Sequence, residues 1–180
     1  MKDSPRKEIL DEIAHAIGKI GLPHPVRVGI DGLSASGKTV FADELAGVLQ
    51  EKGKKVVRAG LDGFHNPPEI RHRQGPMSVE GYVDDSFDYV AVREKVLQPL
   101  GPDGDRRYVP EIFDHQKGDA QTIEPRDAPE DAILLFEGVM LFRKELIDFF
   151  DLRILVMCSV NVILERAKVR DLAHFGDLKT

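Results

Sequence analysis

The sequence lacks the features that mark secreted, membrane-bound or nucleic-acid-gripping proteins. It has one cysteine, Cys158, so no internal disulfide can form. No apolar run approaches the roughly 18 residues of a membrane span, and the charged N-terminus is not followed by the apolar core of a signal peptide. Lysine and arginine number 25 against 31 aspartates and glutamates, a net charge of -6. We expect a cytoplasmic protein with no membrane contact and no nucleic-acid partner.

The hydrophobic pattern predicts one α/β domain spanning residues 1–180. An N-terminal helix within 1–22 is followed by a strand, a turn, a helix and a second strand, and such βαβ units build parallel sheets. The predicted strands are 26–31, 56–59, 132–136 and 152–157, and the later predicted helices are 39–50, 89–97, 142–150 and 161–172. We therefore expect a mostly parallel sheet with helices on both faces. Residues 61–129, rich in proline, glycine and aspartate, are interpreted as a substrate-binding insertion.

One segment satisfies the Walker A pattern G-x-x-x-x-G-K-[ST] and lies between a predicted strand and a predicted helix, as a phosphate-binding loop requires. Glycines let the backbone turn its N–H groups inward onto phosphate oxygens. The following helix directs the positive end of its dipole at the same anion. The pattern indicates a P-loop NTPase-type fold that binds the ATP phosphates through Gly32, Ser34, Ala35, Ser36, Gly37, Lys38 and Thr39.

Acidic side chains follow two of the predicted strands. Glu137 comes directly after the strand 132–136, and Asp62 follows the strand 56–59. The carboxyl ends of parallel strands share the sheet edge where ligands bind, so both acids are expected beside the loop. Glu137 and the Thr39 hydroxyl are suitable Mg²⁺ ligands, and Asp62 could orient and deprotonate an attacking hydroxyl. Taken alone, Glu137 could equally face solvent and Asp62 could belong to a turn.

Five blocks in a fixed order carry a family resemblance. They are 29–39, Asp62-Gly63-Phe64-His65, Asp85-Ser86-Phe87-Asp88, Leu135-Phe136-Glu137-Gly138 and Arg166-Ala167-Lys168-Val169-Arg170-Asp171. From about Val26 to its end, the chain resembles the uridine kinase family, in particular its bacterial uridine kinase-like branch. That branch lies within the group that includes phosphoribulokinase and pantothenate kinase.

The resemblance implies a kinase that uses ATP and Mg²⁺ to phosphorylate the 5′-hydroxyl of a nucleoside, uridine or cytidine first. It implies that Asp62 is the catalytic base and that Thr39 and Glu137 hold magnesium. It also implies that Arg166 and Arg170, on a lid-like helix within 160–180, contact the transferring phosphates. With Lys38 on the phosphates, the candidate catalytic residues are Asp62, Lys38, Arg166 and Arg170.

The resemblance further implies the acceptor contacts, with Asp85 or Asp88 near the ribose hydroxyls and Phe113 and His115 near the base. From the residues alone, the two histidines could be surface groups, the aromatic side chains could be ordinary packing, and the acids could be a solvated loop. The candidate substrate-binding residues are Asp62, His65, Tyr82, Asp85, Phe87, Phe113, His115 and Arg166.

Two departures from the family pattern keep other functions open. The block after Asp62 reads Gly63-Phe64-His65, a form also seen in sugar and pantothenate kinase relatives. The chain ends at Thr180, before the last helix and strand of the family. A kinase of another small alcohol and a nucleotide-binding module without transfer activity are therefore the alternatives. A GTPase switch is disfavoured because no Asn-Lys-x-Asp motif occurs. The partner is expected to be a small molecule, and a homo-oligomer remains open.

Overall fold

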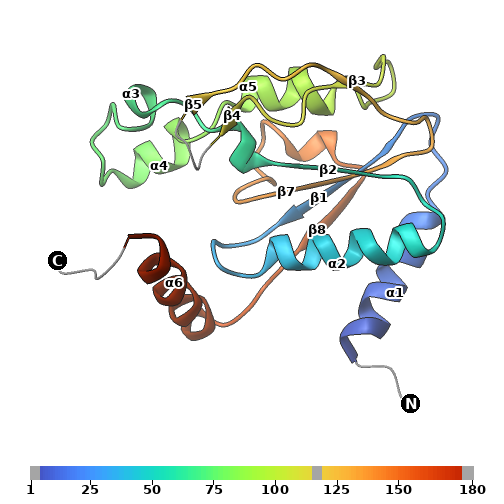
Figure 1. The fold of residues 1–180 in the computed structure, drawn as a ribbon, viewed down its shortest axis with the longest axis horizontal. Coiled ribbons are helices and arrows are strands. Elements are labelled where there is room, and N and C mark those ends of the chain that lie inside the picture. The colour runs from blue at the N-terminus through green and yellow to red at the C-terminus, as the bar shows by residue number, and fades with distance from the viewer. Residues whose placement is uncertain (1–4, 115–118, 176–180) are drawn as a thin grey trace.

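The computed structural model describes residues 5–114 and 119–175, with the backbone alone for Asp119 and residues 170–175. A four-stranded sheet forms its centre (Figure 1), with the strand order β2-β7-β1-β8. All three pairings between neighbouring strands are parallel. Its strands are β1 (Val26–Asp31), β2 (Val56–Gly60), β7 (Ile133–Gly138) and β8 (Leu152–Leu155). The predicted parallel sheet and α/β class are confirmed.

The remaining elements are helices, helical turns and two small antiparallel pairs. The helices are α1 (Pro5–Gly18), α2 (Lys38–Glu51), α3 (Pro68–Arg71), α4 (Val79–Asp85), α5 (Tyr89–Val92) and α6 (Val160–Phe175). The helical turns are η1 (Leu61–Phe64), the π-helical η2 (Arg93–Leu97) and η3 (Ile147–Phe149). In the small pairs, β3 (Arg107–Tyr108) lies against β6 (Arg126–Asp127), and β4 (Phe113–Asp114) lies against β5 (Asp119–Ala120). No helix within the described ranges is both long and apolar enough to cross a bilayer.

The side chains of β7 show how both faces of the sheet are covered. Successive side chains of a strand point to opposite faces. Ile133 and Leu135 pack in one core with α1 and α2. Leu134 and Phe136 pack in a second core with α5, η2 and the loops above them (Figure 1). The helices predicted on both faces are therefore confirmed, and β7 is apolar because neither face meets water.

The helix predicted at 142–150 is wrong. This connection forms turns, and only Ile147–Phe149 is a short 3₁₀ helix. One of its backbone N–H groups forms a tertiary hydrogen bond instead of a helical one: the Phe142 N–H donates to the Asp31 carboxylate at 3.1 Å. The apolar residues that suggested a helix are still buried, with Leu146 and Phe150 both in the second core, the one with α5 and η2.

Candidate active site

The loop between β1 and α2 is folded as tightly as its glycines allow. A Cβ on Gly32 would collide with the Val156 carbonyl oxygen and approach the Ser36 Oγ within 2.9 Å. Gly37 lies in the left-handed region, with φ 97° and ψ 20°, and caps α2. Glycine occupies that region without a steric penalty. The loop thus brings its backbone to the N-terminal end of a 14-residue helix, which is a ready-made anion site.

Polar groups of this loop turn toward its own centre. The Lys38 ammonium donates to the Leu33 carbonyl at 2.9 Å, and Lys38 is only 9% exposed. The Ser36 N–H donates to the same carbonyl at 3.1 Å. The Ser36 Oγ is buried without a hydrogen-bond partner among the residues the structure describes. Ser34 and Thr39 are exposed, and Ala35 is half-buried with φ 60°. A polyphosphate fits this cradle, because it would supply acceptors for buried donors.

Two carboxylates lie near this loop, one at the end of β7 and one just after β2. The Thr39 hydroxyl donates to Glu137 Oε2 at 2.9 Å, which joins the start of α2 to the end of β7. Gly60 and Glu137 are direct partners in the β2–β7 register, so the chain delivers Asp62 close by in η1. The charges of Asp62 and Lys38 both act on Glu137. Three predicted residues from α2 and η1 therefore act on the carboxylate of a fourth, Glu137 in β7.

Glu137 differs electrostatically from an ordinary surface acid. Burial raises the pKa of its carboxyl group, and the charge of Asp62 acts in the same direction. The Thr39 hydrogen bond and the charges of Arg58 and Lys38 oppose that rise. A divalent cation would relieve the same desolvation of the carboxylate. The oxygen donors of Glu137 and Thr39 fit Mg²⁺, which takes one or two protein oxygens together with phosphate oxygens. Across the described ranges, no group of three His, Cys, Asp or Glu suits a metal held by protein alone.

Asp31, at the end of β1, is a site residue that the sequence analysis did not single out. Its Oδ1 accepts from the Gly32 N–H at 2.6 Å, and its Oδ2 accepts from the Phe142 N–H at 3.1 Å. The side chain is 8% exposed. It therefore fixes the phosphate loop to the loop after β7. An acid at the last position of a buried strand, directly before the first motif glycine, was the available signal.

Aromatic and imidazole rings lie beside Asp62. The His65 Nδ1 is 2.8 Å from the Asp62 carbonyl oxygen. The His65 ring centre lies 4.5 Å from that of Phe87 and 6.3 Å from that of Phe113. Phe87 and Phe113 are buried, whereas His65 is half-buried. His65 is therefore the ring of this group that presents the most surface to a ligand.

Two further candidate residues lie on α4. Tyr82 is exposed. The Asp85 carboxylate is 1% exposed and accepts from the Arg73 guanidinium and, at 2.7 Å, from the Gln74 amide. These contacts lower the pKa of Asp85, the Arg73 hydrogen bond most of all. In this arrangement Asp85 holds α4 to the segment after α3, and a substrate could reach it only if that ion pair opened.

Helix α6, which the sequence analysis predicted to be lid-like, contacts the phosphate loop directly. From α6, Arg166 donates through Nη1 to the Ser36 carbonyl at 3.2 Å. Arg170 lies one turn further along α6, where only the backbone is described. His115 falls outside the described residues. Of the two predicted arginines, Arg166 is thus brought to the site by a defined contact.

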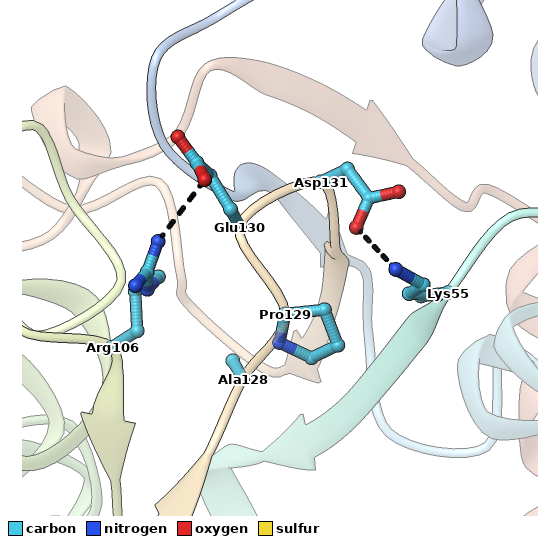
Figure 2. A pocket seen from close by; sticks show the side chains of 6 residues that line it. All are labelled: Lys55, Arg106, Ala128, Pro129, Glu130 and Asp131. Carbon is cyan, nitrogen blue, oxygen red and sulfur yellow. Dashed lines mark hydrogen bonds and ion pairs between the residues drawn. The ribbon is translucent and has the colours of Figure 1, made fainter.

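Two hollows differ in chemistry. One of about 200 Å³ lies beside the phosphate loop and is largely apolar; it is lined by Gly32, Leu33, Leu155, Val156, Met157, Cys158 and Ile163. A larger, open depression of about 520 Å³ lies near the starts of β2 and β7, at the opposite edge of the sheet. Figure 2 shows its four charged side chains paired as Arg106–Glu130 and Lys55–Asp131. Because those charges cancel, it resembles a solvated surface more than a phosphate site.

A glycine-rich loop between the first strand and helix of a parallel sheet, with a neighbouring strand's carboxylate over it, defines a P-loop nucleotide-binding protein of the kinase type. The model of the phosphoribulokinase / uridine kinase family matches residues 27–178. The chain belongs to this family. The resemblance noted from the sequence is confirmed.

Individual relatives agree with this placement. The chain is 29% identical over 154 residues to uridine-cytidine kinase B of Dictyostelium discoideum, a match covering 85% of this chain and 61% of the relative. The solved structure of a possible uridine kinase from Bacillus stearothermophilus has a TM-score of 0.74 at 23% identity, covering 95% of this chain and 96% of that one. A structure from Silicibacter sp. TM1040, provisionally described as a fructose transport system kinase, has a TM-score of 0.75 at 20% identity, covering 92% and 82%. Both structures share the fold.

Proposed function

We propose that this protein transfers the γ-phosphoryl group of ATP to a hydroxyl of a small molecule, with the 5′-hydroxyl of uridine or cytidine as the first candidate. The observation that carries the proposal is the meeting of Glu137 with Thr39 while Asp62 and Lys38 act on the same carboxylate. Phosphoryl transfer needs mainly positioning and electrostatic stabilisation, and these groups supply both around one point.

On the donor side, the loop amides and Lys38 hold the phosphates, and Lys38 exchanges its Leu33 carbonyl for phosphate oxygens. Thr39 and Glu137 would hold Mg²⁺, which would supply positive charge to offset that of the phosphates. The largely apolar hollow beside Gly32 and Leu33 is the adjoining space suited to the base of the donor.

On the acceptor side, Asp62 orients the substrate hydroxyl and takes its proton. The substrate oxygen forms a bond to the γ-phosphorus while the bond from that phosphorus to the β–γ bridging oxygen breaks. ADP then leaves with the negative charge on the former bridging oxygen. Arg166 and Arg170 on α6 stabilise the charge on the transferring oxygens, a task that suits the planar guanidinium fork. The contact from Arg166 to the phosphate loop supports this role.

The acceptor is proposed from weaker grounds. The name of the Dictyostelium relative points to a pyrimidine nucleoside, and the half-buried His65 offers a ring near Asp62. One observation favours a different small alcohol as the second candidate. Phe87 and Phe113 are only 4% and 3% exposed, and Asp85 is committed to Arg73. These residues leave little free surface for stacking on a base or binding ribose.

The test is ATP consumption, with product analysis, across a panel of nucleosides, sugars and other small alcohols, repeated with Asp62→Asn. We expect one acceptor class to stimulate turnover, and we expect Asp62→Asn to lower kcat by about 10²–10⁴-fold with ATP affinity retained. Turnover unchanged in Asp62→Asn would remove Asp62 from the chemistry. ATP binding without turnover on any acceptor would favour a binding module.

A further inference from the structure

A single arginine lies behind the proposed magnesium site. Arg58 interrupts the otherwise apolar strand β2, and its β7 partner in the register is Leu135, two residues before Glu137. Side chains two residues apart on a strand share a face, so Arg58 and Glu137 emerge on the face that α2 covers. Asp43 lies on α2 one turn after Thr39, which puts these two side chains on one side of that helix.

The four side chains close a ring. Thr39 donates to Glu137 Oε2 at 2.9 Å. Arg58 Nη2 forms an ion pair with the other carboxylate oxygen, Oε1, at 3.6 Å. Arg58 Nη1 donates to Asp43 Oδ1 at 2.5 Å. One turn of α2 then connects Asp43 back to Thr39. Each end of the guanidinium therefore contacts a different acid.

This arrangement limits how the Glu137 carboxylate can turn. The guanidinium is planar and rigid, so fixing one of its ends to α2 fixes where the other end points. The contact to Oε1 leaves Oε2 at the Thr39 hydroxyl, where an Mg²⁺ ion would need it. The ring also has a cost, because Arg58 Nε is buried without a hydrogen-bond partner in the described part of the chain. An unsatisfied buried nitrogen lowers stability, so its presence here indicates that Arg58 serves something other than stability.

We propose that Arg58, held by Asp43, is a positioning residue that orients Glu137 for magnesium. The inference rests on the proposed function, in which Glu137 and Thr39 bind the ion. Partners of metal ligands of this kind commonly change metal affinity by about 10–100-fold when removed. A contribution through charge alone would act oppositely, because removing a cation near Mg²⁺ strengthens binding of the ion.

The experiment measures the dissociation constant of a non-hydrolysable ATP analogue by calorimetry, with Mg²⁺ and with a chelator. The ratio of the two constants is the magnesium-dependent gain in affinity. We expect Arg58→Met to lower this gain by about tenfold and to leave binding in chelator nearly unchanged. Arg58→Lys keeps the charge without the fork, so it should also lose most of the gain. The matched control is Arg6→Met, which removes an exposed arginine of α1 that pairs with Glu44, the residue after Asp43 on α2. It should leave the gain unchanged.

Each outcome decides the question. A gain in Arg58→Met that equals or exceeds that of the wild type, while Glu137→Gln abolishes it, overturns the role of Arg58 and leaves the metal site standing. A gain retained in Glu137→Gln removes the metal role of Glu137, and the inference about Arg58 falls with it. Thermal melting verifies that each variant is folded at the assay temperature. If Arg58→Met fails to fold, Arg58→Lys decides, and a full gain in it refutes the positioning role.

Discussion

Replacing Asp151 by alanine should expose how strongly the start of β8 is fixed to the start of β1. The Asp151 carboxylate accepts the Arg27 backbone N–H at 2.8 Å, Nε at 3.2 Å and Nη2 at 3.0 Å. The side chains are 7% and 16% exposed for Arg27 and Asp151. The remaining Arg27 nitrogen, Nη1, donates to the Leu97 carbonyl in η2 at 3.2 Å. One buried pair thus joins the sheet to the helical layer above it.

The expected loss of stability is large because Asp151→Ala leaves the buried Arg27 guanidinium without its carboxylate partner. Removing one partner of a buried pair costs about 3–5 kcal/mol, and the Leu97 carbonyl is the one acceptor among these contacts left to the Arg27 side chain. We expect the free energy of unfolding to fall by about 4 kcal/mol. For a chain of this size the melting temperature should fall by about 8–16 °C.

Urea denaturation followed by circular dichroism measures this loss. The control is Asp131→Ala, which removes an exposed pair with Lys55 whose side chains are 70% and 58% exposed and should cost at most about 1 kcal/mol. The double variant Arg27→Met/Asp151→Ala should lose less stability than the two single variants lose in sum, because no unpaired buried charge remains in it. If Asp151→Ala costs no more than Asp131→Ala, the buried-charge reasoning is refuted.

Two further predictions concern the nucleotide site. Gly32→Ala should weaken ATP binding by about tenfold or more, measured by calorimetry, because its Cβ would collide with the Val156 carbonyl oxygen; unchanged affinity would contradict the tight loop. Burial raises the pKa of Glu137, so magnesium-dependent binding should weaken as the pH falls through that raised pKa, at a higher pH than for an ordinary glutamate. The same group binds its proton more tightly in the folded state, so the metal-free protein should gain stability from it as the pH falls. Glu137→Gln should remove both dependences, and a Gln variant that keeps them would assign them to another group.

The sequence was sufficient wherever the determining contacts are local. The Walker A segment, β1 and α2 are neighbours in the chain, so motif and periodicity together predicted their order. The strand at β7 was recognisable because both of its faces are buried, which makes it continuously apolar. Glu137 and Asp62 followed from strand ends, since parallel strands present their carboxyl ends at one edge.

Contacts between distant segments could not be obtained in this way. Arg58 appears in the sequence as a lone cation in a strand, and only the register of β2 against β7 brings it to Glu137. Asp85 has a sequence typical of an exposed acidic loop, yet Arg73 and Gln74 hold it almost completely buried. The segment 142–150 has apolar spacing compatible with a helix, but the Asp31 carboxylate recruits one of its backbone N–H groups. Tertiary partners determined all three.

The twofold use of Asp31 restricts which lengths the two loops can have. Both of its oxygens accept backbone N–H groups, one from Gly32 and one from Phe142, 110 positions apart in the chain. An added or deleted residue just before Phe142 would draw that N–H out of register and release one oxygen. Loop-length variants at that remote connection should therefore impair phosphate capture.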